Sequence, residues 1–197
     1  MAGSVLVTGG TGGLGAAVTT ALRAAGWRVV LPVRGTPPEP ADDLVPVPAD
    51  LTDEAQVAGA VAVAVEEPGR PLRAVVNLVG GFAGGARVHE TPVADFEALL
   101  RLNLRPLYLV TRAALPHLVA NGGGSVVCVA SQAALRPFSG AAGYVTAKAG
   151  VLAFAAALHA EYARDGVRVN TLLPSVIDTP RNRAEQPGAD PAKWTAP

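Results

Sequence analysis

The sequence has little cysteine and little histidine, and each shortage excludes a class of protein. Its 197 residues include a single cysteine, Cys128, so no disulfide can form within the chain, as is usual in a reducing compartment. The three histidines are scattered without the spacing of metal ligands, and no cysteine accompanies them. We therefore expect neither a disulfide-stapled secreted domain nor a metal site.

Neither sign of charge is in excess, and no hydrophobic run is long. Sixteen basic and sixteen acidic residues cancel, which leaves no electrostatic footprint for nucleic acid. The apolar runs fall far short of the roughly 18 residues of a membrane helix, and Met1–Ser4 lacks the basic segment of a signal peptide. Half of the residues are hydrophobic, enough for one core. We expect one soluble, cytoplasmic domain over residues 1–197, without nucleic-acid or membrane partners.

Short apolar runs alternate with helical patterns along the chain. The runs that predict strands are 4–8, 27–34, 44–48, 74–79, 125–130 and 168–173. The patterns that predict helices are 14–25, 54–65, 91–120 and 143–164. Alternation of this kind is typical of a parallel sheet with helices on both faces. The predicted fold is therefore a Rossmann-like, doubly wound α/β/α domain of three layers.

Prolines mark places where this regular pattern is expected to be disturbed. Two prolines in the run 44–48 confine that strand to a sheet edge, because proline cannot donate to the ladder. Thr91, followed by a proline, is predicted to cap the third helix. Pro106 lies within that helix and predicts a kink or a break into two helices.

A glycine-rich turn follows the first predicted strand. Five of the seven residues in Gly9–Gly15 are glycines, and a helical pattern comes next. Glycines let the backbone approach a pyrophosphate, and a helix N-terminus offers N–H groups and the positive end of a dipole. The alternative is an ordinary tight turn, but its place at the first strand-to-helix turn favours dinucleotide binding. A second glycine cluster, 80–85, indicates another close approach to a ligand.

Three polar residues are placed where chemistry would use them. Tyr144 and Lys148 are four residues apart, so on a helix they share a face, and the cation would stabilise a phenolate. Alone, this pair is more often a solvated helix face than a site. Ser131 follows the strand 125–130, at the end where open parallel sheets bind ligands. Asn103 lies in an apolar stretch and is either a satisfied core amide or a site residue.

Arg34 follows the second predicted strand, about where a residue that recognises the cofactor ribose is expected. The acidic residue usual at that strand end is absent. An arginine suits a 2′-phosphate, which a carboxylate would repel. The alternative is a plain surface arginine.

In this order the motifs resemble the short-chain dehydrogenase/reductase family, from about Val5 to Thr179. The matches include Thr8-Gly9 with Gly13 and Gly15, Asp50-Leu51, Asn77-Leu-Val-Gly80, and the segment from Asn170 through Pro174 to Thr179. The resemblance implies the catalytic tetrad Asn103, Ser131, Tyr144 and Lys148. The cofactor residues expected from these patterns are Gly9, Thr11, Gly13, Leu14, Gly15, Arg34, Asp50, Leu51, Asn77, Gly80, Tyr144, Lys148, Pro174, Ile177 and Thr179.

The resemblance also implies hydride transfer between NADP(H) and a carbonyl or alcohol substrate. Tyr144 would be the general acid or base, and Lys148 would stabilise its phenolate and hold the nicotinamide ribose. Ser131 would hydrogen-bond the substrate oxygen, and Asn103 would anchor a water that leads protons to Lys148. A silent nucleotide-sensing or scaffolding protein of the same fold is the alternative, although such proteins typically lose the tyrosine or the lysine. The sequence does not identify the substrate. The residues expected to border its pocket are Gly81, Phe82, Gln132, Arg136, Phe138 and the segment 181–183.

The sequence departs from the family pattern at three places. Gly12 stands where many NADP-preferring members carry a basic residue, and Ser175 stands where glycine is usual. Family members also continue with a further helix and strand, whereas this sequence stops at Pro197. We expect either a fragment or an exposed sixth strand prone to pairing, with 180–197 forming part of a substrate lid. A complete chain would form a homo-oligomer, a dimer or tetramer.

Overall fold

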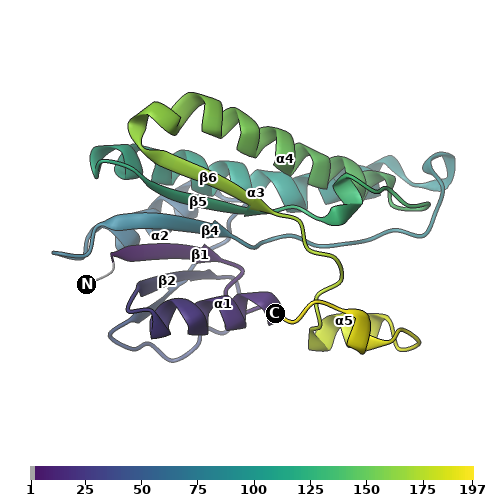
Figure 1. The fold of residues 1–197 in the computed structure, drawn as a ribbon, viewed down its shortest axis with the longest axis horizontal. Coiled ribbons are helices and arrows are strands. Elements are labelled where there is room, and N and C mark those ends of the chain that lie inside the picture. Colours follow the sequence, from purple (N-terminus) through teal and green to yellow (C-terminus); the bar gives the residue numbers. More distant parts are fainter. Residues whose placement is uncertain (1–2) are drawn as a thin grey trace.

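The computed structural model describes residues 3–197, which form one open parallel sheet with helices packed on it (Figure 1). The strands are β1 Ser4–Thr8, β2 Arg28–Val33, β3 Leu44–Pro48, β4 Leu72–Asn77, β5 Gly124–Val129 and β6 Val167–Leu172. Their order in the sheet is β3-β2-β1-β4-β5-β6, and every pairing is parallel. The predicted doubly wound fold is confirmed. Met1 and Ala2, which belong to the segment Met1–Ser4 expected to lack a signal peptide, lie outside the described residues.

The strands bury both faces because successive side chains point to opposite sides. Leu6, Val30 and Val75 belong to a core shared with three helices, α2 Glu54–Val65, α3 Val93–Ala120 and α4 Ala142–Tyr162. Their neighbours Val7, Leu31 and Val76 belong to a second core against α1 Gly13–Ala24. Three helices therefore cover one face, and α1 covers the other over the β1–β2 half.

The prolines of β3 have the predicted effect, whereas Pro106 of the third helix does not. β3, with its two prolines, pairs only with β2 and is an edge strand, as predicted. The predicted break at Pro106 is wrong, because α3 continues through Pro106 and Pro116. Pro106 is buried beside Leu107 and Val110, whose packing keeps the helix in place. The predicted Thr91 cap is also wrong: the cap position is Pro92, and the Thr91 hydroxyl donates to the Arg87 carbonyl at 2.9 Å.

The segment after β6 crosses the carboxyl edge of the sheet towards α1. It forms the short helix α5 Pro180–Glu185, which Figure 1 shows on the same side of the sheet as α1. Thr195 then returns beside the segment, where its N–H donates to the Val176 carbonyl at 2.9 Å and its carbonyl accepts from Asp178 N–H at 2.8 Å. Short 3₁₀ turns, Val88–Glu90, Gln132–Ala134, Ala163–Asp165 and Pro191–Lys193, complete the described elements.

β6 has a single neighbour, β5, so it is an edge strand of the described sheet, as expected. Its side chains alternate between partly buried and exposed, and Leu172 is 56% exposed. Among residues 3–197, no helix combines the length and the hydropathy that a membrane span needs.

Alanine substitutions at two glycines, one in crowded and one in open surroundings, test how closely the backbone of the glycine turn is packed. A Cβ added at Gly15 would overlap the Gly9 carbonyl oxygen and lie 2.7 Å from Gly10 Cα. Gly59 lies in α2, and an added Cβ there would meet no atom within 4 Å. We expect Gly15→Ala to lower the free energy of unfolding by about 1–3 kcal/mol. Gly59→Ala should raise it by about 0.5–1 kcal/mol. Urea unfolding measures both, and a harmless Gly15→Ala would contradict the close approach.

Candidate active site

A cavity of about 600 Å³ opens at the carboxyl ends of β4, β5 and β6. Its walls combine the loop after β4, the loop after β5, the first turns of α4 and the segment that follows β6. Predicted site residues that line it are Leu14, Gly80, Ser131, Tyr144, Lys148, Pro174, Ile177 and Thr179. The expected pocket residues Gly81, Phe82, Gln132, Arg136, Phe138, Arg181 and Asn182 line it as well.

Tyr144 and Lys148 project from one face of α4 into this cavity. Lys148 Nζ lies 5.9 Å from the centroid of the Tyr144 ring and donates a 3.0 Å hydrogen bond to the Val129 carbonyl at the end of β5. The lysine side chain is buried, and this burial lowers its pKa from the ordinary 10.5 to about 8. The pair therefore does not form the solvated helix face that the sequence left open.

Ser131 lies just after β5 with its hydroxyl oriented by a local contact. The residue caps the 3₁₀ turn Gln132–Ala134, and its Oγ accepts from Ala133 N–H at 3.2 Å. A serine hydroxyl has one hydrogen to donate as well as its lone pairs. The donor of Ser131 therefore stays available to an oxygen atom in the cavity.

Asn103 lies beneath the cavity wall, away from its surface. Its Nδ2 donates to the carbonyls of Gly81 at 3.0 Å and Leu99 at 2.9 Å, and its Oδ1 accepts from Gly81 N–H at 3.2 Å. A Cβ added at Gly80 would come within 2.7 Å of Asn103 Oδ1 and 3.0 Å of Lys148 Nζ. Asn103 is thus a satisfied buried amide that also fixes the wall on which Gly80 faces Lys148.

The glycine turn and the segment after β6 meet at one point. Gly9 has a φ of +66°, and a Cβ added at Gly13 would lie 2.6 Å from Thr179 Cγ2. Gly12 is the N-cap of α1, and among residues 3–197 no side chain caps the first N–H groups of that helix. Such a bare glycine-lined helix start fits a pyrophosphate, because N–H groups and the positive dipole end face it.

Other predicted cofactor residues follow the sheet edge beyond the cavity. Arg34 is exposed after β2, and Leu51 is buried after β3. Hydrogen bonds from Thr52 N–H and Oγ1, both 2.8 Å, hold the pKa of Asp50 below its usual value, and the charge of Arg34 adds to this. The predicted residues that do not line the cavity are Gly9, Thr11, Gly13, Gly15, Arg34, Asp50, Leu51, Asn77 and Asn103.

Two threonines that are not among the predicted site residues, Thr8 and Thr111, hold this edge together. Thr8 Oγ1 accepts from the N–H groups of Leu78 at 3.0 Å and Val79 at 3.4 Å, which ties the end of β1 to the loop after β4. Thr111 Oγ1 accepts from Asn77 Nδ2 at 3.3 Å. The position of Thr8 directly before the glycine turn was a usable signal. The Val129 carbonyl, which accepts from Lys148, could not be predicted as a site group, because every residue carries a backbone carbonyl.

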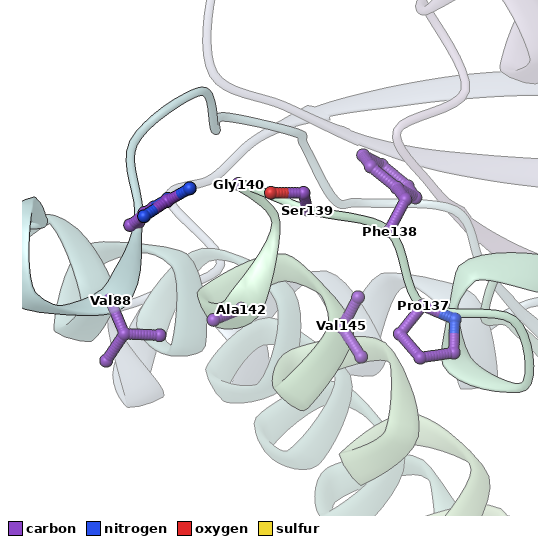
Figure 2. A pocket seen from close by; sticks show the side chains of 8 residues that line it. Val88, Pro137, Phe138, Ser139, Gly140, Ala142 and Val145 are labelled. Carbon is purple, nitrogen blue, oxygen red and sulfur yellow. The ribbon is translucent and has the colours of Figure 1, made fainter.

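A smaller hollow of about 390 Å³ lies on the outer side of the loop 137–140 (Figure 2). Its lining residues are Arg87, Val88, Pro137, Phe138, Ser139, Gly140, Ala142 and Val145. It shares only Phe138 with the larger cavity. The smaller hollow has no acid–base pair like Tyr144 and Lys148 among its lining residues. The larger cavity is therefore the candidate active site.

Known proteins match the chain along most of its length. A 2-(R)-hydroxypropyl-CoM dehydrogenase of Xanthobacter autotrophicus is 35% identical over 196 residues, covering 92% of this chain and 78% of that protein. A levodione reductase of Leifsonia aquatica is 32% identical over 200 residues, covering 95% of this chain and 74% of that protein. One of these relatives is named as a dehydrogenase and the other as a reductase.

A solved structure gives the same result for the fold. The 3-ketoacyl-(acyl-carrier-protein) reductase from Brucella melitensis, complexed with NADH, matches with a TM-score of 0.82 and 29% identity. The match covers 90% of this chain and 77% of that one. The family model for short chain dehydrogenases matches residues 4–190. Sequence, fold and relatives agree with the predicted resemblance, and the chain belongs to the short-chain dehydrogenase/reductase family of oxidoreductases.

Proposed function

We propose that this protein transfers a hydride between NADP(H) and a carbonyl or alcohol carbon, with Tyr144 as the acid–base group. The observation that carries the proposal is the placement of Tyr144, Ser131 and the buried Lys148 on the wall of one cavity. The named activities of the relatives support the reaction class, and the NADH complex of the Brucella reductase supports a nicotinamide cofactor.

Tyr144 and Ser131 would handle the substrate oxygen. In reduction the Tyr144 hydroxyl donates a proton to that oxygen, and in oxidation the phenolate accepts one. The Ser131 hydroxyl, whose lone pair is used by Ala133 N–H, donates a hydrogen bond to the same oxygen and holds it in place. When bound, the cofactor supplies or accepts the hydride.

Lys148 would act as an electrostatic and positioning group. One of its three N–H donors goes to Val129, which leaves two for groups inside the cavity, such as ribose hydroxyls. Its positive charge near the Tyr144 ring would stabilise the phenolate. Asn103 would position Gly80 and Gly81 against this lysine, and the water that the family resemblance assigns to it stays a prediction.

Arg34 would select the phosphorylated cofactor. It is exposed beyond β2, and its guanidinium makes no hydrogen bond within residues 3–197, so its donors are available for a 2′-phosphate. The glycine turn at Gly9–Gly15 would hold the pyrophosphate, and Asp50 and Leu51 would border the adenine. No observation favours the silent sensor or scaffold, since the full tetrad is present.

Tyr144→Phe should lower turnover by a factor of about 100 or more and leave NADPH binding nearly unchanged, because only the acid–base hydroxyl is lost. The rate is followed as NADPH oxidation with a panel of ketones, aldehydes and quinones. Tyr108→Phe is the matched control, since Tyr108 lies on α3 with 52% of its surface exposed. A variant with near-parental rate would refute the assignment of Tyr144. A parent chain that binds NADPH but turns over no compound would support the silent alternative.

Arg34→Asp should reverse the cofactor preference, because a carboxylate repels the 2′-phosphate that the arginine attracts. We expect the parent to bind NADPH at least about tenfold more tightly than NADH, equal to about 1.4 kcal/mol. Fluorescence titration with both cofactors measures the two dissociation constants. Arg101→Asp makes the same charge change on an exposed part of α3 and should leave the preference unchanged. Equal affinity of the parent for both cofactors would show that Arg34 is a surface charge only.

The burial of Lys148 should make stability depend on pH. Its pKa is about 8 in the folded protein and 10.5 without burial, so the unfolded chain holds more protons between these values. The free energy of unfolding of the parent, relative to Lys148→Met, should therefore rise from pH 8 to pH 10.5, by about 3 kcal/mol at most. Below pH 8 the difference should be constant.

Urea unfolding across this pH range tests the dependence. Lys193→Met is the control, because the side chain of Lys193 is 82% exposed and should show no comparable change. A difference between the parent and Lys148→Met that stays flat from pH 8 to pH 10.5 would contradict the burial of the lysine.

A further inference from the structure

Arg136 differs from the other cations that line the cavity, because its guanidinium has no partner among residues 3–197. Arg181 Nε donates to Glu185 Oε1 at 2.7 Å, and Lys148 donates to the Val129 carbonyl. Contrary to expectation, Arg183, two residues after Arg181 in α5, does not line the cavity, and it is paired through two nitrogens with Asp178. Within residues 3–197 the Arg136 guanidinium makes neither a hydrogen bond nor an ion pair, although it lines the cavity. The side chain is exposed, so its donors are available to a ligand in the cavity.

The backbone fixes Arg136 relative to the residue proposed to hold the substrate oxygen. Ser131 caps the turn Gln132–Ala134, and the N–H groups of Leu135 and Arg136 both donate to the Gln132 carbonyl. Gln132 N–H in turn donates to the Pro174 carbonyl at 3.0 Å. The backbone of Arg136 is thereby tied to the turn that Ser131 caps, and both side chains line the same cavity.

Aromatic side chains line the space around Tyr144. The ring of Phe82 meets the Tyr144 ring edge-on at 5.1 Å between centroids, and Phe138 lies 6.1 Å from Phe82. Phe82 and Phe138 are 49% and 54% exposed, so an apolar or aromatic ligand body would cover them. Phe138, which Figure 2 shows on the loop 137–140, lines both the smaller hollow and the larger cavity.

From these three observations we infer that the substrate is an anion: a carbonyl or alcohol compound with an apolar or aromatic body and a carboxylate or sulfonate that pairs with Arg136. The inference rests on the proposed function, because it places the reacting carbon at Ser131 and Tyr144. The guanidinium fork matches the two oxygens of such a group, which a point charge would not do. Phe82 and Phe138 hold the body between the two polar ends.

Binding of a matched pair of probes tests this inference without requiring turnover. 4-Acetylbenzoate and its methyl ester have the same ketone and ring and differ in the anionic group. Isothermal titration calorimetry measures their binding to the protein saturated with oxidised cofactor, which cannot reduce the ketone. We expect the parent to bind the acid about tenfold more tightly than the ester, and the preference to shrink as salt is raised.

Arg136→Gln removes the charge at similar length, and we expect it to abolish the preference while ester binding stays unchanged. Arg101→Gln, which removes a charge from the exposed surface of α3, should keep the preference. The inference is overturned if the parent shows no preference, including the case in which neither probe binds, or if Arg136→Gln retains it. Both failures leave hydride transfer standing, whereas a parent that discriminates but catalyses no reduction overturns the proposed function alone.

Discussion

The hydrogen bond from Lys148 Nζ to the Val129 carbonyl is the contact on which the site depends. At 3.0 Å it joins α4 to the end of β5, and it brings a lysine into an environment that lowers its pKa to about 8. A buried cation is costly unless it is hydrogen-bonded. The Val129 carbonyl offsets part of that cost and fixes the ammonium beside the Tyr144 ring. The same contact orients the helix face that carries both side chains into the cavity.

The parallel sheet supplies the rest of the framework, because all its strands end at one edge. Hydrogen bonds tie neighbouring strand ends to each other: Thr8 Oγ1 accepts from Leu78 N–H, and Ala130 N–H donates to the Leu172 carbonyl at 2.9 Å. Asn103 does the same for Gly81 from α3. These ties join β1, the loops after β4 and β5, and the segment after β6 into one wall around the candidate site.

Sequence periodicity predicted the six strands and the main helices, because alternation and helical spacing are local properties. Spacing also placed Tyr144 and Lys148 on one face, but it could not decide between a solvated face and a cavity. That choice depends on Val129 and Gly80, which are distant in sequence. The helix break expected at Pro106 failed for the same reason, since tertiary packing outweighs the local preference of a proline. The pairing of Arg181 with Glu185, which distinguishes it from Arg136, is an i,i+4 contact, and it was missed because the short helix α5 was not predicted.

The proposed site requires that Lys148 is buried, and the low lysine content of the chain makes this burial easy to measure. It contains two lysines, Lys148 and Lys193. Protein labelled with ¹³C-lysine therefore gives two side-chain signals in an NMR titration, and Lys193→Arg identifies the one that belongs to Lys148. We predict that the Lys148 signal titrates with a midpoint near pH 8. A midpoint at the ordinary value of 10.5 would show a solvated side chain and contradict the proposed site.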